Sequence, residues 1–286
     1  MLLKRAVISR LQPLLAHRVY TVRHGLAKGL RRRGGLGFVP QFGLGSAEEQ
    51  FLEGLSLGGL TVYDVGGYEG IFTLFFARRV GPSGSVVTFE PNPRNFKKIT
   101  DNIALNGFAH ARVRQVALGS VPGRASLVFP ADETARGSLE TDIADQIRQE
   151  KDVVTIDVDV DTLDNQVASG LPEPDFVKLD VEGLELDVLQ GMTSVMKRRH
   201  PRLYIEIHGA DVERKLANVT AVASFLWQHG YTVLHVESGT TLEGTDQLPV
   251  AIGVTSTARR SATTISAKCF SFARRSKSRK AVTDGN

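Results

Sequence analysis

The feature that most constrains the fold of this chain is an alternation of short apolar strands and amphipathic helices. β-Rich runs at 61–65 and 85–90 are followed by runs at 70–80 and 93–106, in which apolar residues recur at helical spacing. A third β-rich run follows at 111–119. Strands joined by helices run parallel with a right-handed crossover, and a near-continuous apolar strand suits burial on both faces. The alternation therefore predicts an α/β fold with a doubly wound, Rossmann-like parallel sheet.

The middle of the chain interrupts this alternation. Two β-rich runs at 125–130 and 152–160 flank a polar stretch at 131–151, which predicts a β-rich insertion with a mobile loop. Strand–helix alternation then returns, and we expect the last apolar run to close an antiparallel hairpin. The elements expected in this part are strands at 175–181, 201–209, 231–237 and 249–255, and helices at 183–196 and 212–230.

Charged residues divide the chain of 286 residues into an acidic body and two basic ends. Residues 1–47 hold nine Lys and Arg and no acid, whereas 256–286 hold eight Lys and Arg and one acid. Residues 48–255 hold 18 basic and 30 acidic side chains, a net charge of −12. We therefore expect a basic N-terminal extension (1–47), a folded domain (48–255) and a basic, disordered C-terminal tail (256–286).

The N-terminal extension has a pattern of its own. Leu3, Val7, Leu11, Leu14 and Leu15 fall at helix-like spacing among basic residues. Three interpretations stay open: a segment that packs on the body or stays mobile, a transit peptide, and a basic amphipathic helix on an anionic membrane surface. No apolar run reaches the ~18 residues of a membrane-spanning helix. We expect a cytoplasmic protein, with peripheral membrane contact through this segment as an alternative.

Composition removes other classes of site and partner. The single cysteine, Cys269, excludes a disulfide framework and a multi-cysteine metal site, and it favours a reducing compartment. The acidic body argues against nucleic acid as a partner, although an RNA methyltransferase that uses its basic ends stays an alternative.

A glycine-rich loop follows the first strand. It reads Asp64-Val-Gly66-Gly67-Tyr-Glu-Gly70, with an acid before the first glycine. In an open α/β sheet, ligands bind outside the carboxyl ends of the strands, and glycines let the backbone turn tightly there. A pyrophosphate favours bare N–H groups, whereas an acid in this place suits a ligand with an amine or a sulfonium. The loop therefore predicts a cofactor site for a cationic ligand.

The next strand adds a second acid at the same edge. Glu90 follows Asp64 by 26 residues, close to the ~20 expected for an acid that binds ribose hydroxyls, and Asn92 comes two residues later. The third strand leaves the sheet near Ala117, where an adenine would lie. Together these positions predict S-adenosylmethionine as the cofactor, with Asp64, Gly66, Gly67, Gly70, Glu90, Asn92 and Ala117 as its binding residues.

Two later strands bring further charges to this edge. Lys178, Asp180 and Glu182 alternate along one strand, and Glu206 and His208 share a face at the end of the next. These charges either neutralise one another or line a substrate pocket. Since histidine accepts a proton near neutral pH, we predict His208 or Asp180 as the catalytic base, assisted by Lys178, which would hold the acids in place. Glu182 and Glu206 would lie at the substrate.

Several motifs in this order resemble the FkbM family of S-adenosylmethionine-dependent methyltransferases. The resemblance covers roughly residues 48–255. Its most specific part is KLDVEGLE after an FEP strand. The motifs are DVGGYEG at 64–70, FEPNP at 89–93, the N-x-x-L-N of Asn102–Asn106, the T-L-D of Thr162–Asp164, KLDVEGLE at 178–185 and EIH at 206–208.

The resemblance implies a class I methyltransferase domain over 48–255, with a seven-stranded sheet that contains one antiparallel strand. It implies O-methylation of a hydroxyl on a sugar, glycan, lipid or natural product, and it places Asp180, Glu182 and His208 near the transferred methyl group. The loop departs from the family pattern at Gly67-Tyr68, where a small residue and Asn are usual.

Two questions stay open at this level. A binding module of the same fold that holds a nucleoside without turnover is an alternative to the enzyme. We assign no metal ligands, although a divalent ion on Asp180 and Glu182 is a minority alternative that would lower the pKa of the acceptor hydroxyl. A small-molecule or glycan acceptor is the expected partner.

Overall fold

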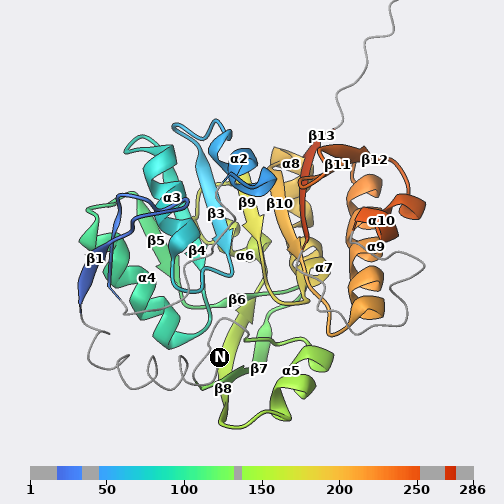
Figure 1. Ribbon diagram of the computed structural model, residues 1–286, viewed down its shortest axis with the longest axis horizontal. Helices are drawn as coiled ribbons and strands as arrows, with labels where there is room; N and C mark the ends of the chain where they lie inside the picture. Colours follow the sequence, from blue (N-terminus) through green and yellow to red (C-terminus); the bar gives the residue numbers. More distant parts are fainter. Residues whose placement is uncertain (1–17, 34–44, 132–136, 252–267, 275–286) are drawn as a thin grey trace, which may run out of the picture.

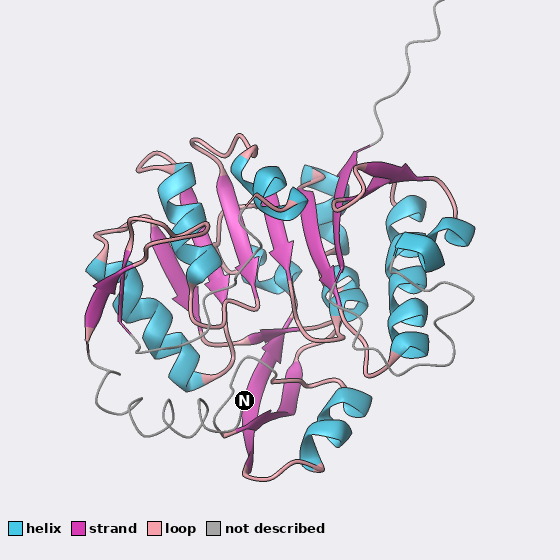
Figure 2. Cartoon of the chain, viewed as in Figure 1, coloured by secondary structure: helices cyan, strands magenta, loops and turns pink. Residues whose placement is uncertain are grey.

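A computed structural model of the chain describes residues 18–33, 45–131, 137–251 and 268–274, and a mixed eight-stranded sheet forms its centre (Figures 1 and 2). Neighbouring strands from β5 to β10 are parallel, whereas β13 is antiparallel to both of its neighbours and β12 is antiparallel to β11. The order across the sheet is β5 (Ala111–Arg114), β4 (Ser85–Phe89), β3 (Thr61–Val65), β9 (Phe176–Leu179), β10 (Arg202–Ile207), β13 (Lys268–Arg274), β11 (Tyr231–His235) and β12 (Thr240–Leu242).

The end of this sheet corrects three expectations. The run 249–255 is not a strand where it is described, because Leu248–Ala251 forms the helix α10, with Leu248 and Ala251 in the core. A short apolar run suits a buried helical turn as well as a strand. The antiparallel strand is instead β13, which lies within the part expected to be a disordered tail. The domain therefore extends past 255, and the edge strand β12 raises the count from seven strands to eight.

Helices cover both faces of the sheet because its strands are apolar on both sides. Val62 and Phe176 face one cluster of buried residues, whereas their neighbours Tyr63 and Val177 face another. One face carries α2 (Ala47–Glu53), α3 (Ile71–Val80) and α4 (Pro93–Leu105), and the other carries α6 (Leu163–Ala168), α7 (Glu185–Gln190), α8 (Thr193–Arg199) and α9 (Val212–Gln228). The short helix η2 (Thr245–Gln247) precedes α10. Among the described residues, no helix has the length and apolar character needed to cross a membrane.

The expected helix at 183–196 is two helices, α7 and α8, because the chain turns at Gly191. A Cβ atom at Gly191 would collide with the main-chain carbonyl of Gly119. This close approach fixes the path of the chain just behind the carboxyl end of β9.

The insertion forms a separate small sheet below the edge at which the parallel strands end (Figure 1). It contains β6 (Ala117–Leu118), β7 (Gly123–Pro130) and β8 (Val153–Asp161), with β8 between the other two. The polar stretch 131–151 contains the helix α5 (Thr141–Arg148), and 132–136 lie outside the described residues. The expectation of a loop there is wrong for α5, since Ala144 and Ile147 are buried on one side of a helix whose other residues are mostly polar.

Part of the N-terminal extension packs on the domain. The strands β1 (Val19–Thr21) and β2 (Arg31–Arg33) form an antiparallel pair. The side chain of Asn106, the residue that caps the C-terminus of α4, accepts from the Arg31 N–H at 2.8 Å and donates to the Arg31 carbonyl at 2.7 Å. Asn102 accepts from the Arg33 N–H at 2.8 Å. The two asparagines of the N-x-x-L-N motif therefore hold β2. The apolar residues from Leu3 to Leu15, for which three interpretations were open, lie outside the described residues.

Candidate functional site

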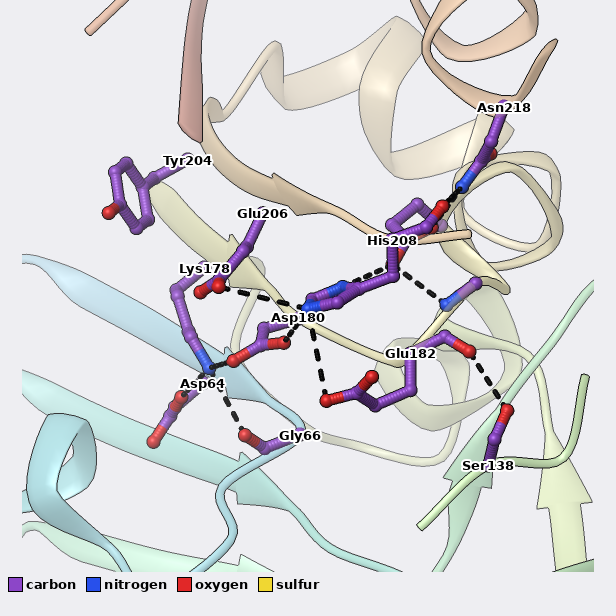
Figure 3. Close-up of polar contacts among 12 residues, drawn as sticks. Asp64, Gly66, Ser138, Lys178, Asp180, Glu182, Tyr204, Glu206, His208 and Asn218 are labelled. Carbon is purple, nitrogen blue, oxygen red and sulfur yellow. Dashed lines mark hydrogen bonds and ion pairs between the residues drawn. The ribbon is translucent and has the colours of Figure 1, made fainter. Parts of the chain in front are cut away.

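The predicted site residues meet at the carboxyl end of the parallel strands. Asp64 and Lys178 are register partners on the neighbouring strands β3 and β9. Asp180 follows β9, and Glu206 and His208 come from β10 and the residue after it. Figure 3 shows Asp64, Lys178, Asp180 and His208 in a row across this edge, with Glu182 and Glu206 on either side of the imidazole.

The glycine loop is shaped by contacts within the protein. Gly66 has a φ of +79°, and a Cβ atom there would collide with the main-chain carbonyl oxygen of Asp180. A Cβ atom at Gly67 would collide with the Thr88 side chain, and Gly70 begins α3 with a φ of +85°. The loop therefore lies directly on the segment that leaves β9, and only glycine permits that approach.

Asp64 lies beneath this loop and has protein partners. The Thr73 hydroxyl donates to its Oδ2 at 2.7 Å, the Thr88 hydroxyl donates to Thr73 at 3.0 Å, and Lys178 Nζ lies 3.7 Å from Oδ1. Burial raises the pKa of Asp64, while Lys178 and the Thr73 hydrogen bond oppose this shift. The carboxylate is fully buried, so a direct contact with a cofactor stays a prediction.

Glu90 joins the loop to the next strand end. Its Oε2 accepts from the Tyr68 N–H and its Oε1 from the Asn92 N–H, both at 2.8 Å. Burial raises the pKa of Glu90 to about 7, although these backbone hydrogen bonds and one from Asn95 favour the ionised form. The carboxylate is thus positioned by two main-chain groups on either side of it.

The Asn92 side chain has two polar atoms, and among the described residues one has a hydrogen-bond partner and the other has none. Its side-chain oxygen accepts from the Arg94 N–H at 2.9 Å and caps α4. Its Nδ2 is buried, and within the described part of the chain it has no hydrogen-bond partner. A buried amide donor of this kind suits a ligand with an acceptor atom.

Sequence reasoning missed an ion-pair network on the far side of the loop. Glu69 is buried between the Arg32 guanidinium of β2, with which it forms an ion pair, and Lys98 Nζ of α4 at 2.6 Å. The run of arginines at 31–33 contains no signal that separates the buried Arg32 from its exposed neighbours. The N-terminal segment therefore contacts the glycine loop directly.

Lys178 connects the two halves of the site. Its buried Nζ donates to Asp180 Oδ2 at 2.9 Å and to the Gly66 carbonyl at 3.1 Å, and it lies 4.7 Å from the centre of the Phe72 ring. Burial lowers its pKa, but Asp180 and Asp64 outweigh this and raise it above the usual value. Lys178 therefore links the two acids as a charged group.

His208 is held from behind by residues that sequence reasoning did not assign. Its Nδ1 lies 3.2 Å from Glu185 Oε1, and Glu185 is completely buried. Asn218 Nδ2 donates to Glu185 Oε2 at 2.5 Å and to the His208 carbonyl at 2.8 Å. Glu185 is the last residue of KLDVEGLE, and that motif was the available signal; Asn218 on α9 had none.

The other imidazole nitrogen faces three carboxylates (Figure 3). His208 Nε2 lies 3.7 Å from Asp180 Oδ1, 3.8 Å from Glu182 Oε1 and 3.7 Å from Glu206 Oε1. Glu182 has a φ of +52°, which is unusual outside glycine, and Ser138 donates to its carbonyl at 2.8 Å. The insertion therefore helps to fix this turn.

Electrostatics in this cluster are dominated by burial and mutual repulsion. Burial raises the pKa of Glu182 to about 7 and that of Glu206 to about 8, with Asp180 adding to both shifts. Burial would lower the pKa of His208, but Glu182, Glu185 and Asp180 raise it well above its usual value. Burial would likewise raise the pKa of Asp180, yet Lys178 and His208 hold it below its usual range.

Ala117 lies apart from these polar groups. It belongs to β6, is buried, and pairs with Val160 of β8. The third strand is thus split, because β5 ends at Arg114 and β6 joins the small sheet. A contact between Ala117 and an adenine stays a prediction.

Comparisons with known proteins show which family this chain resembles. A family model described as the methyltransferase FkbM domain matches residues 64–233. Methyltransferase 1 of Beauveria bassiana is 28% identical over 144 residues, which cover 46% of this chain and 57% of that protein. The hexuronic acid methyltransferase AglP of Haloferax volcanii is 32% identical over 126 residues, which cover 43% of this chain and 47% of that protein. The chain thus spans about half the length of these curated relatives.

Among solved structures, methyltransferase FkbM from Methylobacillus flagellatus aligns with a TM-score of 0.46 and 17% identity, over 77% of this chain and 45% of that one. The family model covers more than half of this chain and includes every strand end that contributes a side chain to the site. The chain belongs to the FkbM methyltransferase family.

Proposed function

We propose that this chain transfers a methyl group from S-adenosylmethionine to a hydroxyl of a sugar or natural product. Family membership supports the reaction class, and a relative named as a hexuronic acid methyltransferase supports a sugar-like acceptor. The observation that carries the proposal is the pair formed by Glu90 and Asn92 beside the glycine loop.

This pair fits the nucleoside part of the cofactor. The Glu90 carboxylate already has fixed oxygens, and each keeps capacity to accept from a ribose hydroxyl. Asn92 Nδ2 is a buried donor that an acceptor atom of the cofactor would satisfy. S-Adenosylmethionine supplies a methyl carbon that its sulfonium already activates, so the protein's task is alignment and exclusion of water.

The cluster of Asp180, Glu182, Glu206 and His208 forms the acceptor side of the site. It lies one strand away from the cofactor loop, and Lys178 joins the two through Asp180 and the Gly66 carbonyl. Several oxygen acceptors around one imidazole suit a polar acceptor with more than one hydroxyl. These residues would hold the acceptor hydroxyl, and bound S-adenosylmethionine would supply the methyl group that is transferred to it.

Calorimetric titration of the full chain with S-adenosylmethionine and S-adenosylhomocysteine tests the proposal. We expect binding by the wild type, and roughly 30-fold weaker binding by Glu90→Gln, because a hydrogen bond to an ionised group contributes about 2 kcal/mol. The matched control is Glu213→Gln, an exposed glutamate on α9. Absence of binding by the folded wild type would contradict the proposal.

A second measurement separates the enzyme from a binding module of the same fold. Transfer of a labelled methyl group to hexuronic acids, other sugars and hydroxylated natural products is assayed with the same variants. Methylation of at least one hydroxyl is expected. Tight cofactor binding with no transfer to any acceptor, in wild type and control alike, would favour the non-catalytic module.

We also propose cytoplasmic action, with peripheral contact between the basic N-terminal segment and anionic lipid. Nine basic residues and no acid in 1–47 support this. Arg32 is not available for lipid, since it pairs with Glu69. Sedimentation with vesicles that contain phosphatidylserine is expected at low salt and is lost at high salt; equal sedimentation with neutral vesicles would contradict the electrostatic contact.

A further inference from the structure

The spacing of groups around His208 Nε2 is unusual for a network of hydrogen bonds. Its three carboxylate contacts are 3.7 to 3.8 Å long, which is beyond hydrogen-bond range. They come from three places in the chain: the exit of β9, the turn after it and the end of β10. The three carboxylates therefore surround His208 Nε2 without forming a hydrogen bond to it.

The same spacing fits ligands of one cation. One ligand atom each from Asp180, Glu182 and His208 can be chosen so that all lie within 4.8 Å of one another. Two ligands of a single ion cannot be farther apart than twice the metal–ligand distance, which is about 4 Å for Mg²⁺ and about 5 Å for Ca²⁺. Neighbouring ligands of one ion lie closer than this, about 3 Å apart for Mg²⁺ and about 3.5 Å for Ca²⁺. The set, with Nε2 at 3.7 and 3.8 Å from the carboxylates of Asp180 and Glu182, would therefore close on a divalent ion through side-chain shifts of less than about 1 Å.

An independent feature outside this set points the same way. Glu185, which is not a candidate ligand, holds His208 Nδ1 from a fully buried position, and Asn218 in turn holds Glu185. A carboxylate on one imidazole nitrogen fixes the ring and directs the other nitrogen outward, which is the usual support of a histidine that binds a metal. Here Nε2 is the nitrogen directed into the space between the carboxylates.

The charges of the side chains around His208 also favour a bound cation. The four acids around His208 are Asp180, Glu182, Glu185 and Glu206. The basic group that contacts them besides the imidazole is Lys178, and Lys178 also serves Asp64. Partly buried carboxylates in excess of their cations are costly unless a further cation joins them.

We propose that Asp180, Glu182 and His208 bind a divalent cation, with Glu206 beside them, and that this cation holds the acceptor hydroxyl of the proposed methyl transfer. The inference rests on the proposed function for its role and on geometry for its site. A cation here would polarise the acceptor hydroxyl and anchor a neighbouring oxygen of a sugar. It makes His208 Nε2 a ligand, in place of the catalytic base that the sequence predicts.

Mn²⁺ is the probe that suits this ligand set, because it accepts carboxylate oxygens and tolerates imidazole. The full chain is treated with chelator, dialysed and titrated with MnCl₂, and free Mn²⁺ is followed by its electron paramagnetic resonance signal together with calorimetry. One Mn²⁺ per chain is expected. No binding at millimolar Mn²⁺ would overturn the proposal.

Variants locate the ion. Glu182→Gln and His208→Ala are expected to weaken Mn²⁺ binding at least 100-fold. Glu185→Gln tests positioning and is expected to weaken it about 10- to 100-fold. Asp159→Asn, an exposed acid on β8, is the matched control. Equal Mn²⁺ affinity in all four variants would place the ion elsewhere and overturn the proposal.

Two further readouts separate this proposal from the proposed function. Thermal unfolding shows whether each variant is folded, and Glu182→Gln is the safer variant because the described residues give its carboxylate no hydrogen bond. Cofactor titration in chelator is expected to match that with Mn²⁺, while methyl transfer falls at least 100-fold and returns with Mn²⁺. Methyl transfer that is unaffected by chelator overturns the metal site alone, whereas loss of cofactor binding in every condition overturns the proposed function.

Discussion

The two halves of the site treat their carboxylates in opposite ways. At the cofactor end, Asp64 and Glu90 are buried and receive short hydrogen bonds from hydroxyl and backbone donors. At the acceptor end, Asp180, Glu182 and Glu206 are partly exposed and face His208 at distances beyond a hydrogen bond. Lys178 is the charged contact between the halves.

The difference shows which end of the site is already ordered by hydrogen bonds within the protein and which end is not. Among the described residues, most polar side-chain atoms at the proposed cofactor end have hydrogen-bond partners in the protein, and the exceptions include Asn92 Nδ2 and Asp64 Oδ1, so a ligand there would add contacts to an ordered frame. The end proposed to hold the methyl acceptor has more carboxylate oxygens than hydrogen-bond donors. The ligand bound there would therefore decide how these side chains are finally arranged. Preorganisation is therefore concentrated at the end of the site where the cofactor is proposed to bind.

The largest loss of stability is expected from a substitution at the contact between the two halves of the site. Gly66→Ala places a Cβ atom against the Asp180 carbonyl at a positive φ. We expect a loss of about 4 kcal/mol in the free energy of unfolding. Urea denaturation measures it, with Gly123→Ala as control because nothing lies near that position. A loss below that of the control would mean that the halves are not rigidly joined.

A smaller loss is expected from the support behind the cofactor loop. Arg32→Met leaves Glu69 buried with Lys98 alone, and we expect a loss of about 3 kcal/mol in stability and weaker cofactor binding. Adding Glu69→Gln to this variant should restore part of the stability. Arg31→Met, at an exposed position, is the control. Unchanged cofactor affinity in Arg32→Met would show that the N-terminal segment supports stability only.

The pH dependence of cofactor binding comes next in size. Because the pKa of Glu90 is raised to about 7, its carboxylate takes up a proton as the pH falls below 7 and then accepts fewer hydrogen bonds from a ribose. Cofactor affinity should therefore fall between pH 8 and pH 6, by calorimetry, and stay flat in this range in Glu90→Gln. An equal fall in both proteins would assign the dependence to another group.

The same shift has the opposite sign for stability without cofactor. A carboxyl whose pKa is raised on folding stabilises the fold below its unfolded pKa, and this contribution is lost as the pH rises through 7. Glu90→Gln should therefore be more stable than the wild type at pH 8, by about 1 to 3 kcal/mol. A less stable variant at pH 8 would show that its backbone hydrogen bonds outweigh burial.

The smallest effect is expected from a change that should alter stability without altering either end of the site. Asp164 of the T-L-D motif accepts from the Ser194 and Val195 N–H groups and caps α8, away from both halves. Asp164→Ala should cost about 1 kcal/mol of stability and leave cofactor affinity unchanged. A change in affinity would show that α8 also positions the site.

The sequence predicted the elements whose pattern of apolar residues is compatible with one type of secondary structure. The strands 61–65 and 85–89 are buried on both faces and rich in β-branched and aromatic residues, so their assignment follows from these short runs themselves. The helix α5 was missed because Ala144 and Ile147 are too few apolar residues to show a period among polar neighbours. The strand β13 was missed because its basic surroundings resemble a tail, although Phe270 and Phe272 alternate with small or polar residues as in a strand.

The site residues that lie at or just after the ends of strands could be predicted from the sequence. Lys178, Asp180, Glu206 and His208 were grouped in this way, and they do meet. Partners that arrive from other elements, such as Arg32 and Asn218, depend on how helices and the N-terminal strands pack. One sequence contains no local pattern that reports such packing.

The position of β13 has a consequence for how the chain reaches its native state. The parallel strands β10 and β11 flank β13, so both keep an unpaired edge until residues 268–274 insert between them. During synthesis these residues leave the ribosome after both neighbours, which exposes two strand edges that can pair with other chains. We expect insertion of β13 to be the slow step of refolding, and a chain shortened at 255 to aggregate even though it retains every residue of the site.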